Sequence, residues 1–318
     1  MVLSIILTVY NKESFLKRAF DSILSQIGSN DCDYEVIVVN DGSTDGSKLI
    51  IENYCRDNSL IRVITQSNQG LSMARNNGVA YAIGDYVWFV DADDIIAPDS
   101  VSLIIDATKT HPDIIPIYAE TKGVLGVRNK IPTNAKTGRD ILLSKSWNHC
   151  GPFYIYKRSF LNDNNLHYIP GIYHEDSELT PRLLFFAKTV VVIPKVLYSV
   201  IRDPNSITQI PRKKRAYDYI IVAENLYNFS RQFISNDDLL LRCVYDSVIS
   251  VVINNALSII CVYDYNDQIN FNNLLFNKKF LFQSLKGASS FKYKIESLLF
   301  KLFPRHCVNI YKIMKSIW

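Results

Sequence analysis

Three carboxylates stand within four positions of the 318-residue sequence, at Asp91, Asp93 and Asp94. They follow the apolar run 86–90, which is typical of a strand buried on both faces. Carboxylates this close repel one another unless a cation neutralises them, and Mg²⁺ or Mn²⁺ is bound by one or two carboxylates together with substrate phosphates. The pattern therefore predicts a divalent-cation site at the end of this strand. The alternative is an acidic loop in which Asp93 or Asp94 caps a helix.

The elements expected to position these carboxylates alternate between strand and helix. Continuous apolar runs predict strands at 4–9, 34–39, 61–64 and 86–90. Apolar residues at helical spacing predict helices at 13–26, 45–56 and 70–83. This alternation predicts an α/β domain in which these strands are parallel, and ligands of such sheets collect at the carboxyl ends of the strands. Polar residues follow three of the predicted strands, at 8–11, 40–43 and 91–94.

Further along the chain the pattern changes twice. Short strands are predicted at 114–118 and 190–193, and the sequence is mostly helical after the basic run 211–215. We therefore expect a catalytic domain over residues 1–212 and a helical region over 213–318. The longest apolar stretch, 248–262, is interrupted by two asparagines, so no transmembrane helix is expected.

Composition excludes several classes of protein. With 48% hydrophobic and 21% charged residues, the chain can bury a core, which excludes wholesale disorder. The net charge of +4 is too small to indicate nucleic-acid binding. Six scattered cysteines without a C-x-x-C pair favour reduced thiols in a cytoplasmic protein. The N-terminus lacks the basic region of a signal peptide.

Five segments together resemble the family 2 glycosyltransferases of the GT-A fold, an inverting class that uses nucleotide-diphosphate sugars. They are SIILTVYN at 4–11, EVIVVNDGSTD at 35–45, NQGLSMARNNG at 68–78, DADD at 91–94 and HED at 174–176. The resemblance covers about residues 3–205. It implies a Rossmann-like mixed sheet flanked by helices, with a mostly helical C-terminal extension that matches no family.

The resemblance also implies which residues contact the donor. They are Thr8, Val9, Tyr10, Glu13, Asp41, Arg75, Asp91, Ala92 and, on a later loop over the diphosphate, Arg202. Asp41 would accept a hydrogen bond from uracil, although a turn-forming Asp before Gly42 is an alternative. The guanidinium of Arg75 suits a diphosphate or a base, and a solvated helix residue is the alternative. Thr8 stands where the family usually has proline.

The same resemblance assigns the reaction chemistry to acidic residues. Asp93, with Asp91, would hold Mg²⁺ or Mn²⁺ against the diphosphate and so offset the charge of the leaving group. Asp176 matches the general base that deprotonates the acceptor hydroxyl, with Glu175 as second choice. Both acids would also suit the first turn of a helix. His174 is a further metal ligand, an acceptor contact or a structural residue.

Aromatic residues suggest where the acceptor binds. Trp147 and Tyr154 belong to a stretch that resembles the variable lining of the family's acceptor pocket. Aromatic faces suit the apolar sides of sugar rings, and an aromatic core explains them equally well.

The C-terminal segment 277–318 concentrates positive charge. It has nine basic residues and one acid, a net +8, which leaves −4 for residues 1–276. Phenylalanine, leucine and isoleucine are interleaved with the lysines. This pattern is typical of an amphipathic surface lying on an anionic membrane, and a solvated face packed on the catalytic domain or on a second subunit is the alternative.

The predicted function is transfer of a sugar from a UDP-sugar to a saccharide acceptor, lipid-linked, at the cytoplasmic face of a bacterial membrane during surface-polysaccharide synthesis. A non-catalytic nucleotide-sugar-binding scaffold is disfavoured by the intact carboxylates. A nucleotidyltransferase is disfavoured because residues 8–11 form no Gly-rich basic loop. The donor sugar, the linkage and the oligomeric state stay open.

Overall fold

The computed structural model describes residues 1–26, 33–201 and 212–317. Two compact units are present, Met1–Gly171 with Leu183–Ser206, and Ile172–Arg182 with Ile207–Trp318. The short segment Ile172–Arg182 therefore groups with the C-terminal helices and not, as the expected boundary at 212 implied, with the catalytic domain. The reason is its bonding. The backbone N–H of Tyr173 donates to Asp218 at 2.8 Å, and the Tyr245 hydroxyl donates to the carbonyl of Pro181 at 2.7 Å.

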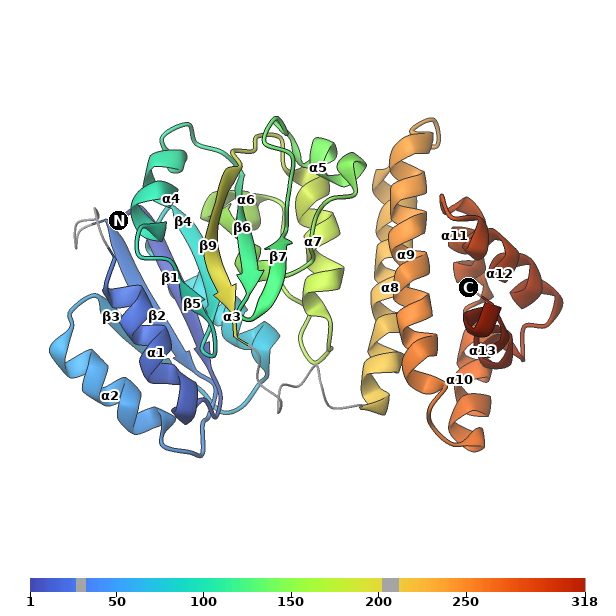
Figure 1. The fold of residues 1–318 in the computed structure, drawn as a ribbon, viewed down its shortest axis with the longest axis horizontal. Coiled ribbons are helices and arrows are strands. Elements are labelled where there is room, and N and C mark those ends of the chain that lie inside the picture. The colour runs from blue at the N-terminus through green and yellow to red at the C-terminus, as the bar shows by residue number, and fades with distance from the viewer. Residues whose placement is uncertain (27–32, 202–211, 318) are drawn as a thin grey trace. The chain divides into compact units, whose positions relative to one another are not determined.

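The first unit is built on a mixed sheet of nine strands in the described part of the chain, in the order β3-β2-β1-β4-β8-β6-β9-β5 with β7 beside β6 (Figure 1). The strands are β1 Leu3–Val9, β2 Tyr34–Asn40, β3 Ile61–Thr65, β4 Tyr86–Asp91, β5 Ile95–Ile96, β6 Ile114–Thr121, β7 Val124–Arg128, β8 Tyr154–Lys157 and β9 Ile193–Val200. The strands from β3 to β4 are parallel, and β8 is antiparallel to both of its neighbours. The predicted mixed sheet flanked by helices is confirmed.

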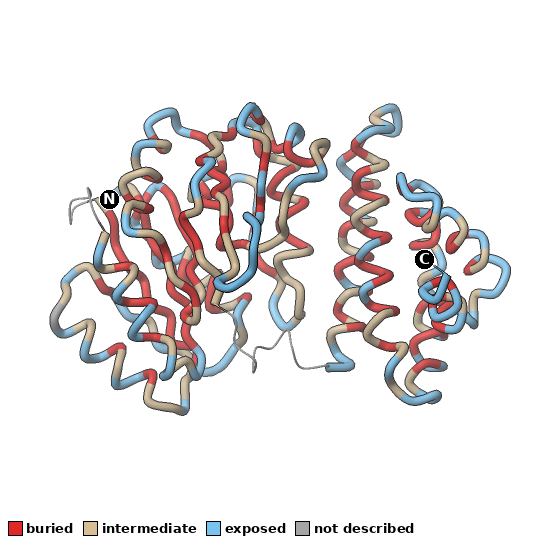
Figure 2. The backbone as a smooth tube through the Cα atoms, viewed as in Figure 1, coloured by how far each residue is buried: buried red, intermediate tan, exposed pale blue. Residues whose placement is uncertain are grey.

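The central strands form because their sequences are apolar on both faces. All seven residues of β1 and of β2 are buried, and Figure 2 shows these central strands in red. The helices of this unit are α1 Glu13–Leu24, α2 Ser47–Asp57, α3 Leu71–Tyr81, α4 Ser100–Thr108, α5 Gly138–Ser144 and α6 Arg158–Asp163, with a 3₁₀ turn at Gly151–Phe153. Helix α7, Glu175–Phe186, belongs partly to each unit.

One strand prediction was wrong. A strand was expected at 190–193, but only an isolated bridge from Val190 to Ile114 lies there, and β9 begins at Ile193. Pro194 and Lys195 of β9 are exposed, so the strand carries no continuous apolar run.

Strand register brings the carboxyl ends together. Val9 pairs with Asn40, Thr8 pairs with Asp91, and Asn40 pairs with Thr65. The loops that follow β1, β2, β3 and β4 therefore begin at one edge of the sheet.

The second unit is helical over its described residues. Its further helices are α8 Lys213–Phe233, α9 Leu239–Ile260, α10 Tyr265–Asn277, α11 Phe282–Gly287, α12 Phe291–Leu302 and α13 Cys307–Ile317, with a 3₁₀ turn at Lys279–Leu281. Among the helices described, α9 is long and apolar enough to cross a membrane by length and composition, but 61% of its most apolar window is buried inside the protein, as in a core helix. Glu296 of α12 is fully buried and accepts a hydrogen bond from Asn254 of α9 at 2.9 Å.

Candidate active site at the carboxyl ends of the strands

The loops after β1 and β2 are bonded to each other. The side-chain oxygen of Asn11 accepts a hydrogen bond from the backbone of Thr44 at 2.7 Å, and the backbone of Asn11 donates to the Ser43 hydroxyl at 3.1 Å. Glu13 was expected to contact the nucleotide sugar. Its carboxylate accepts a hydrogen bond from the backbone N–H of Gly46 at 2.9 Å, just before α2. These bonds hold both loops in one arrangement.

Asp41 connects β2 to the start of α3. Its side chain is 3% exposed and accepts three hydrogen bonds of 2.8 Å, from the side chain of Gln66 and from the backbones of Gln69 and Gly70. These bonds join the end of β2 to the segment before α3, whereas the local bond at the Gly42 turn runs from the backbone of Ser43 to Asn40 Oδ1 at 3.0 Å. Contact of Asp41 with uracil stays a prediction.

The buried guanidinium of Arg75 pairs with the carboxylate of Asp91, whose side chain is 29% exposed. Arg75 is 1% exposed, and its Nη2 donates to Asp91 Oδ1 at 3.1 Å. The guanidinium also lies over the rings of Tyr168 at 5.0 Å and Phe89 at 5.8 Å. The alternative of a solvated helix arginine is therefore wrong.

Asp93 is paired with a lysine from the first loop. Lys12 Nζ lies 2.5 Å from Asp93 Oδ2, and Arg18 donates to the Asp93 carbonyl at 2.9 Å. The side chains of Lys12 and Asp93 are 26% and 20% exposed, so the pair is reachable from solvent.

Asp94 is the buried member of the acidic trio. It accepts from the Tyr198 hydroxyl and from the backbone of Ile201, each at 2.8 Å. Burial, together with the nearby charges of Asp91 and Asp93, raises the pKa of Asp94 to about 7. The residues after it form β5, so the helix-capping alternative for Asp93 and Asp94 is wrong.

The remaining residues that are predicted to contact the nucleotide sugar differ in their exposed fraction. The ring of Tyr10 is 45% exposed, whereas Val9 and Ala92 are each 1% exposed and offer a ligand little but backbone. Thr8 is 8% exposed. Arg202 lies outside the described residues.

The two predicted acceptor aromatics have different surroundings. Tyr154 is 1% exposed, and its hydroxyl donates to the carbonyl of Asn148 at 2.7 Å. Its ring has no free face for a sugar, which makes it a core residue, the explanation that the sequence left equally open. Trp147 is half-buried and packs edge-on against His149, with ring centroids 4.8 Å apart.

Residues 174–176 belong to the second unit. The ring of His174 stacks on Tyr219 at 3.6 Å, and its Nε2 accepts from Arg215 at 3.4 Å. Burial, and then the charge of Arg215, lower the pKa of His174 to about 3, so the ring is neutral and its Nε2 is engaged as an acceptor. Glu175 and Asp176 start α7 and are partly exposed, as first-turn acids should be.

Comparison with known proteins identifies the fold around these loops. Residues 4–164 match the family described as Glycosyl transferase family 2. The chain belongs to this family. One relative, the uncharacterized glycosyltransferase EpsJ of Bacillus subtilis, is 33% identical over 227 residues, which span 67% of this chain and 64% of the relative, so the match falls short of that protein's full length.

Solved structures agree on the glycosyltransferase fold. The S. aureus TarS 1–349 complex with UDP-GlcNAc has a TM-score of 0.78 at 19% identity, covering 99% of this chain and 91% of that one. The mannosyltransferase PcManGT of Pyrobaculum calidifontis, in complex with GDP-Man and Mn²⁺, has a TM-score of 0.54 at 16% identity, covering 99% and 87%. At these identities the likeness concerns the fold.

The carboxylates at this corner fit a cation whose coordination is completed by a bound substrate. No group of three or more His, Cys, Asp or Glu side chains able to hold a metal occurs in the described part of the chain. Asp91 and Asp93 offer two hard carboxylates, and Mg²⁺ usually takes one or two carboxylates, substrate phosphates and water. A cation binding there would have to replace Lys12 at Asp93.

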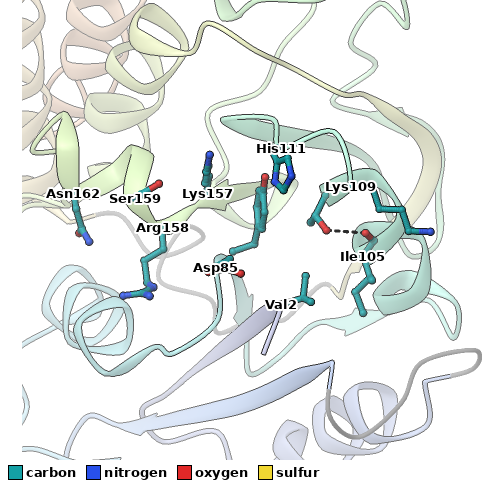
Figure 3. Close-up of a pocket in the computed structure, with 11 residues that line it drawn as sticks. Val2, Asp85, Ile105, Lys109, His111, Lys157, Arg158, Ser159 and Asn162 are labelled. Carbon is teal, nitrogen blue, oxygen red and sulfur yellow. Dashed lines mark hydrogen bonds between the residues drawn. The ribbon is translucent and has the colours of Figure 1, made fainter.

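A cavity lies elsewhere in this unit. It has a volume of about 610 Å³ and is lined by Val2, Asp85 and Tyr86 at the amino ends of β1 and β4 (Figure 3). Lys109 and Arg158 extend in different directions there, pairing with Asp106 and with the carbonyl of Gly84, each at 2.8 Å. The cavity does not include the acidic trio.

The sequence analysis did not predict the roles of three residues of the site. Lys12 pairs with Asp93, Asp94 is buried, and the Tyr198 hydroxyl donates to Asp94. A lysine next to the first loop carries no local sign that it pairs with Asp93, 81 residues away. Tyr198 stands in a strand whose bounds were mispredicted.

Proposed function

We propose that this protein transfers a sugar from a UDP-sugar to a hydroxyl group of a saccharide, with inversion at the anomeric carbon. The observation that carries the proposal is the pair of accessible carboxylates, Asp91 and Asp93, each matched by a cation at the carboxyl edge of a family 2 sheet. The UDP-GlcNAc complex of the structural relative TarS supports a uridine donor.

The acidic corner would bind the diphosphate end of the donor. Asp91 and Asp93 would hold Mg²⁺ or Mn²⁺, which when bound offsets the negative charge that develops on the leaving diphosphate. Arg75 holds the Asp91 carboxylate in place, because its buried guanidinium donates to Asp91 Oδ1 at 3.1 Å. The exposed ring of Tyr10 is available to stack on the base.

Asp176 is the proposed general base. It lies in the first turn of α7 and is partly exposed. An ionised carboxylate placed against the acceptor hydroxyl takes up its proton as the oxygen attacks the anomeric carbon. Glu175 is the second choice, and His174 is left with an orienting role in its stack with Tyr219.

A lipid-linked acceptor at the cytoplasmic face of a membrane is the proposed setting. The exposed face of α12 presents Phe291, Leu298 and Leu302, which are 59–68% exposed, at helical spacing with Lys294 and Lys301. Neither lysine has an acidic partner among the residues described. Apolar side chains flanked by unpaired lysines suit the surface of an anionic bilayer.

Two substitutions test the proposal. A panel of nucleotide sugars with Mn²⁺ is first screened for thermal stabilisation, since a ligand at 100 times its Kd adds about 2.7 kcal/mol to the free energy of unfolding. Asp93→Ala should lose the metal-dependent stabilisation. Asp176→Asn should keep it and lose transfer by about 10²-fold or more. Full transfer activity in either variant would contradict the assignment.

A further inference from the structure

We propose that Lys12 is a resident counter-ion of Asp93, which occupies this carboxylate until a divalent cation arrives together with the nucleotide diphosphate. The inference rests on the proposed function, because it takes Asp93 as a ligand of that cation. It adds a role for Lys12, which makes metal and nucleotide bind as a pair rather than separately.

The ammonium of Lys12 is held in place by its surroundings. Besides the 2.5 Å contact with Asp93 Oδ2, it lies over the ring of Phe15 at 5.5 Å. Arg18 shares that ring at 5.7 Å and donates to the Asp93 carbonyl. The backbone of Lys12 donates to Ser47 Oγ at 2.9 Å, at the start of α2. Four contacts from α1 and its flanking loop thus direct a positive charge to Asp93.

The two ion pairs of the corner differ in how easily they open. Arg75 is 1% exposed and packed between aromatic rings, so it stays with Asp91. The side chain of Lys12 is 26% exposed, and a lysine ammonium is a compact point charge that water hydrates strongly once its partner is removed. Lys12 is therefore the cation that an incoming metal displaces.

The displacement has different consequences with and without nucleotide. A metal ion alone must break the Lys12–Asp93 pair, and the freed ammonium gains no new partner. When a diphosphate accompanies the metal, the ammonium can turn to phosphate oxygens, which are strong acceptors for lysine. Lys12 thus weakens metal binding in the absence of nucleotide. It makes nucleotide increase the affinity for the metal, and the metal must then increase the affinity for nucleotide by the same factor.

The test measures Mn²⁺ affinity directly, from the electron paramagnetic resonance signal of free Mn²⁺, with and without UDP. It uses the full chain and Lys12→Met, with Lys17→Met as matched control, because Lys17 lies in α1, the helix that Lys12 directly precedes, and pairs with Asp21. We expect Lys12→Met to bind Mn²⁺ about fivefold more tightly without UDP, the size of one partly exposed ion pair. The ratio of the two Mn²⁺ dissociation constants, without and with UDP, should fall by at least the same factor. Lys17→Met and Lys12→Arg should behave as wild type.

Each other outcome has a definite meaning. If Lys12→Met shows no tighter Mn²⁺ binding without UDP, or an unchanged ratio, the inference is wrong. If UDP binds equally well with and without Mn²⁺ and weakens in Lys12→Met, Lys12 replaces the metal permanently, which also contradicts it. Asp93→Ala separates the two proposals. If Mn²⁺ still binds to Asp93→Ala, the proposed metal site is wrong. If Asp93→Ala loses Mn²⁺ binding while Lys12→Met binds Mn²⁺ as wild type does, only the counter-ion role of Lys12 is wrong.

Discussion

At the scale of single residues, three neighbouring aspartates acquire three different environments. Asp91 faces Arg75, Asp93 faces Lys12, and Asp94 is buried against Tyr198. The sequence shows that the acids exist and follow a strand, which is enough to predict a cation-binding corner. Their partners stand 16, 81 and 104 positions away, so only the folded chain reveals which acid is accessible and which is structural.

Removing the Tyr198 hydroxyl should weaken the corner without changing the carboxylate of a proposed metal ligand. This hydroxyl donates to Asp94 and accepts from the backbone N–H of Asp91 at 3.1 Å. Tyr198→Phe leaves both groups without that partner, and we expect the free energy of unfolding in urea to fall by about 2–3 kcal/mol.

Tyr86→Phe is the matched control for this change. The Tyr86 hydroxyl is buried and makes one hydrogen bond, to the carbonyl of Pro112 at 2.9 Å, so its loss should cost about 1 kcal/mol. Metal-dependent UDP affinity should decrease only in Tyr198→Phe. Equal stability and equal UDP affinity in the two variants would contradict the role given to Tyr198.

Glu35 should make stability depend on acid pH. Burial alone would raise the pKa of this carboxyl, but hydrogen bonds from Ser4, the backbone of Ile83 and Arg62 outweigh it and lower the pKa below 4.5. A lowered folded-state pKa stabilises the protein above the unfolded value and loses that contribution as pH falls through the folded value. The stability difference between wild type and Glu35→Gln should therefore be constant above about pH 5 and shrink below it. A difference that grows on acidification would show the opposite sign of shift.

At the scale of elements, sequence patterns succeeded where a strand is buried on both faces. The runs at β1, β2 and β4 are continuous because helices or loops cover both sides of the sheet. They failed at β9, whose buried positions are interrupted by Pro194 and Lys195, and at β5, which has two residues. Both pair with each other at the far side of the sheet, a long-range contact without local pattern.

Gly42 tests how the loop after β2 positions Asp41. Its φ is 73°, and a Cβ there would lie 2.8 Å from the backbone nitrogen of Asn68. We expect Gly42→Ala to cost about 2–4 kcal/mol, from the left-handed backbone and from the clash together, and to lower UDP affinity because Asp41 and the start of α3 move apart. Urea unfolding and calorimetric UDP titration measure the two effects.

Gly123→Ala isolates the backbone part of that cost. Gly123 has a φ of 76° with no atom within 4 Å of the added Cβ, so only about 1–2 kcal/mol is expected and UDP affinity should be unchanged. Similar losses in both variants would show that the contact with Asn68 does not matter.

At the scale of the whole molecule, charge and apolar exposure are divided along the chain. Residues 277–318 carry +8 and the rest −4. The sequence predicted the basic amphipathic character of this segment. It did not show which apolar residues stay outside, because Phe300 is fully buried while Leu298 and Leu302 of the same helix are exposed.

Vesicle flotation tests the proposed membrane contact. The full chain should bind vesicles containing phosphatidylglycerol, and not pure phosphatidylcholine, with binding weakened by salt. Leu298→Ser with Leu302→Ser should reduce binding at least tenfold, since each exposed leucine would bury apolar area in the bilayer. Leu49→Ser, which removes a 62% exposed leucine from α2, is the control and should bind as wild type. Two results would assign this face to something other than lipid. One is unchanged flotation of the double variant. The other is light scattering that shows a dimer for the wild-type chain and a monomer for the double variant.

The most direct test of the account is where Mn²⁺ lies in a crystal soaked with UDP and MnCl₂. We predict one anomalous peak at the Asp91 and Asp93 carboxylates, next to the phosphates of UDP, with Lys12 moved off Asp93. Ordered UDP whose phosphates lie away from Asp91 and Asp93, with no peak at either carboxylate, would contradict it.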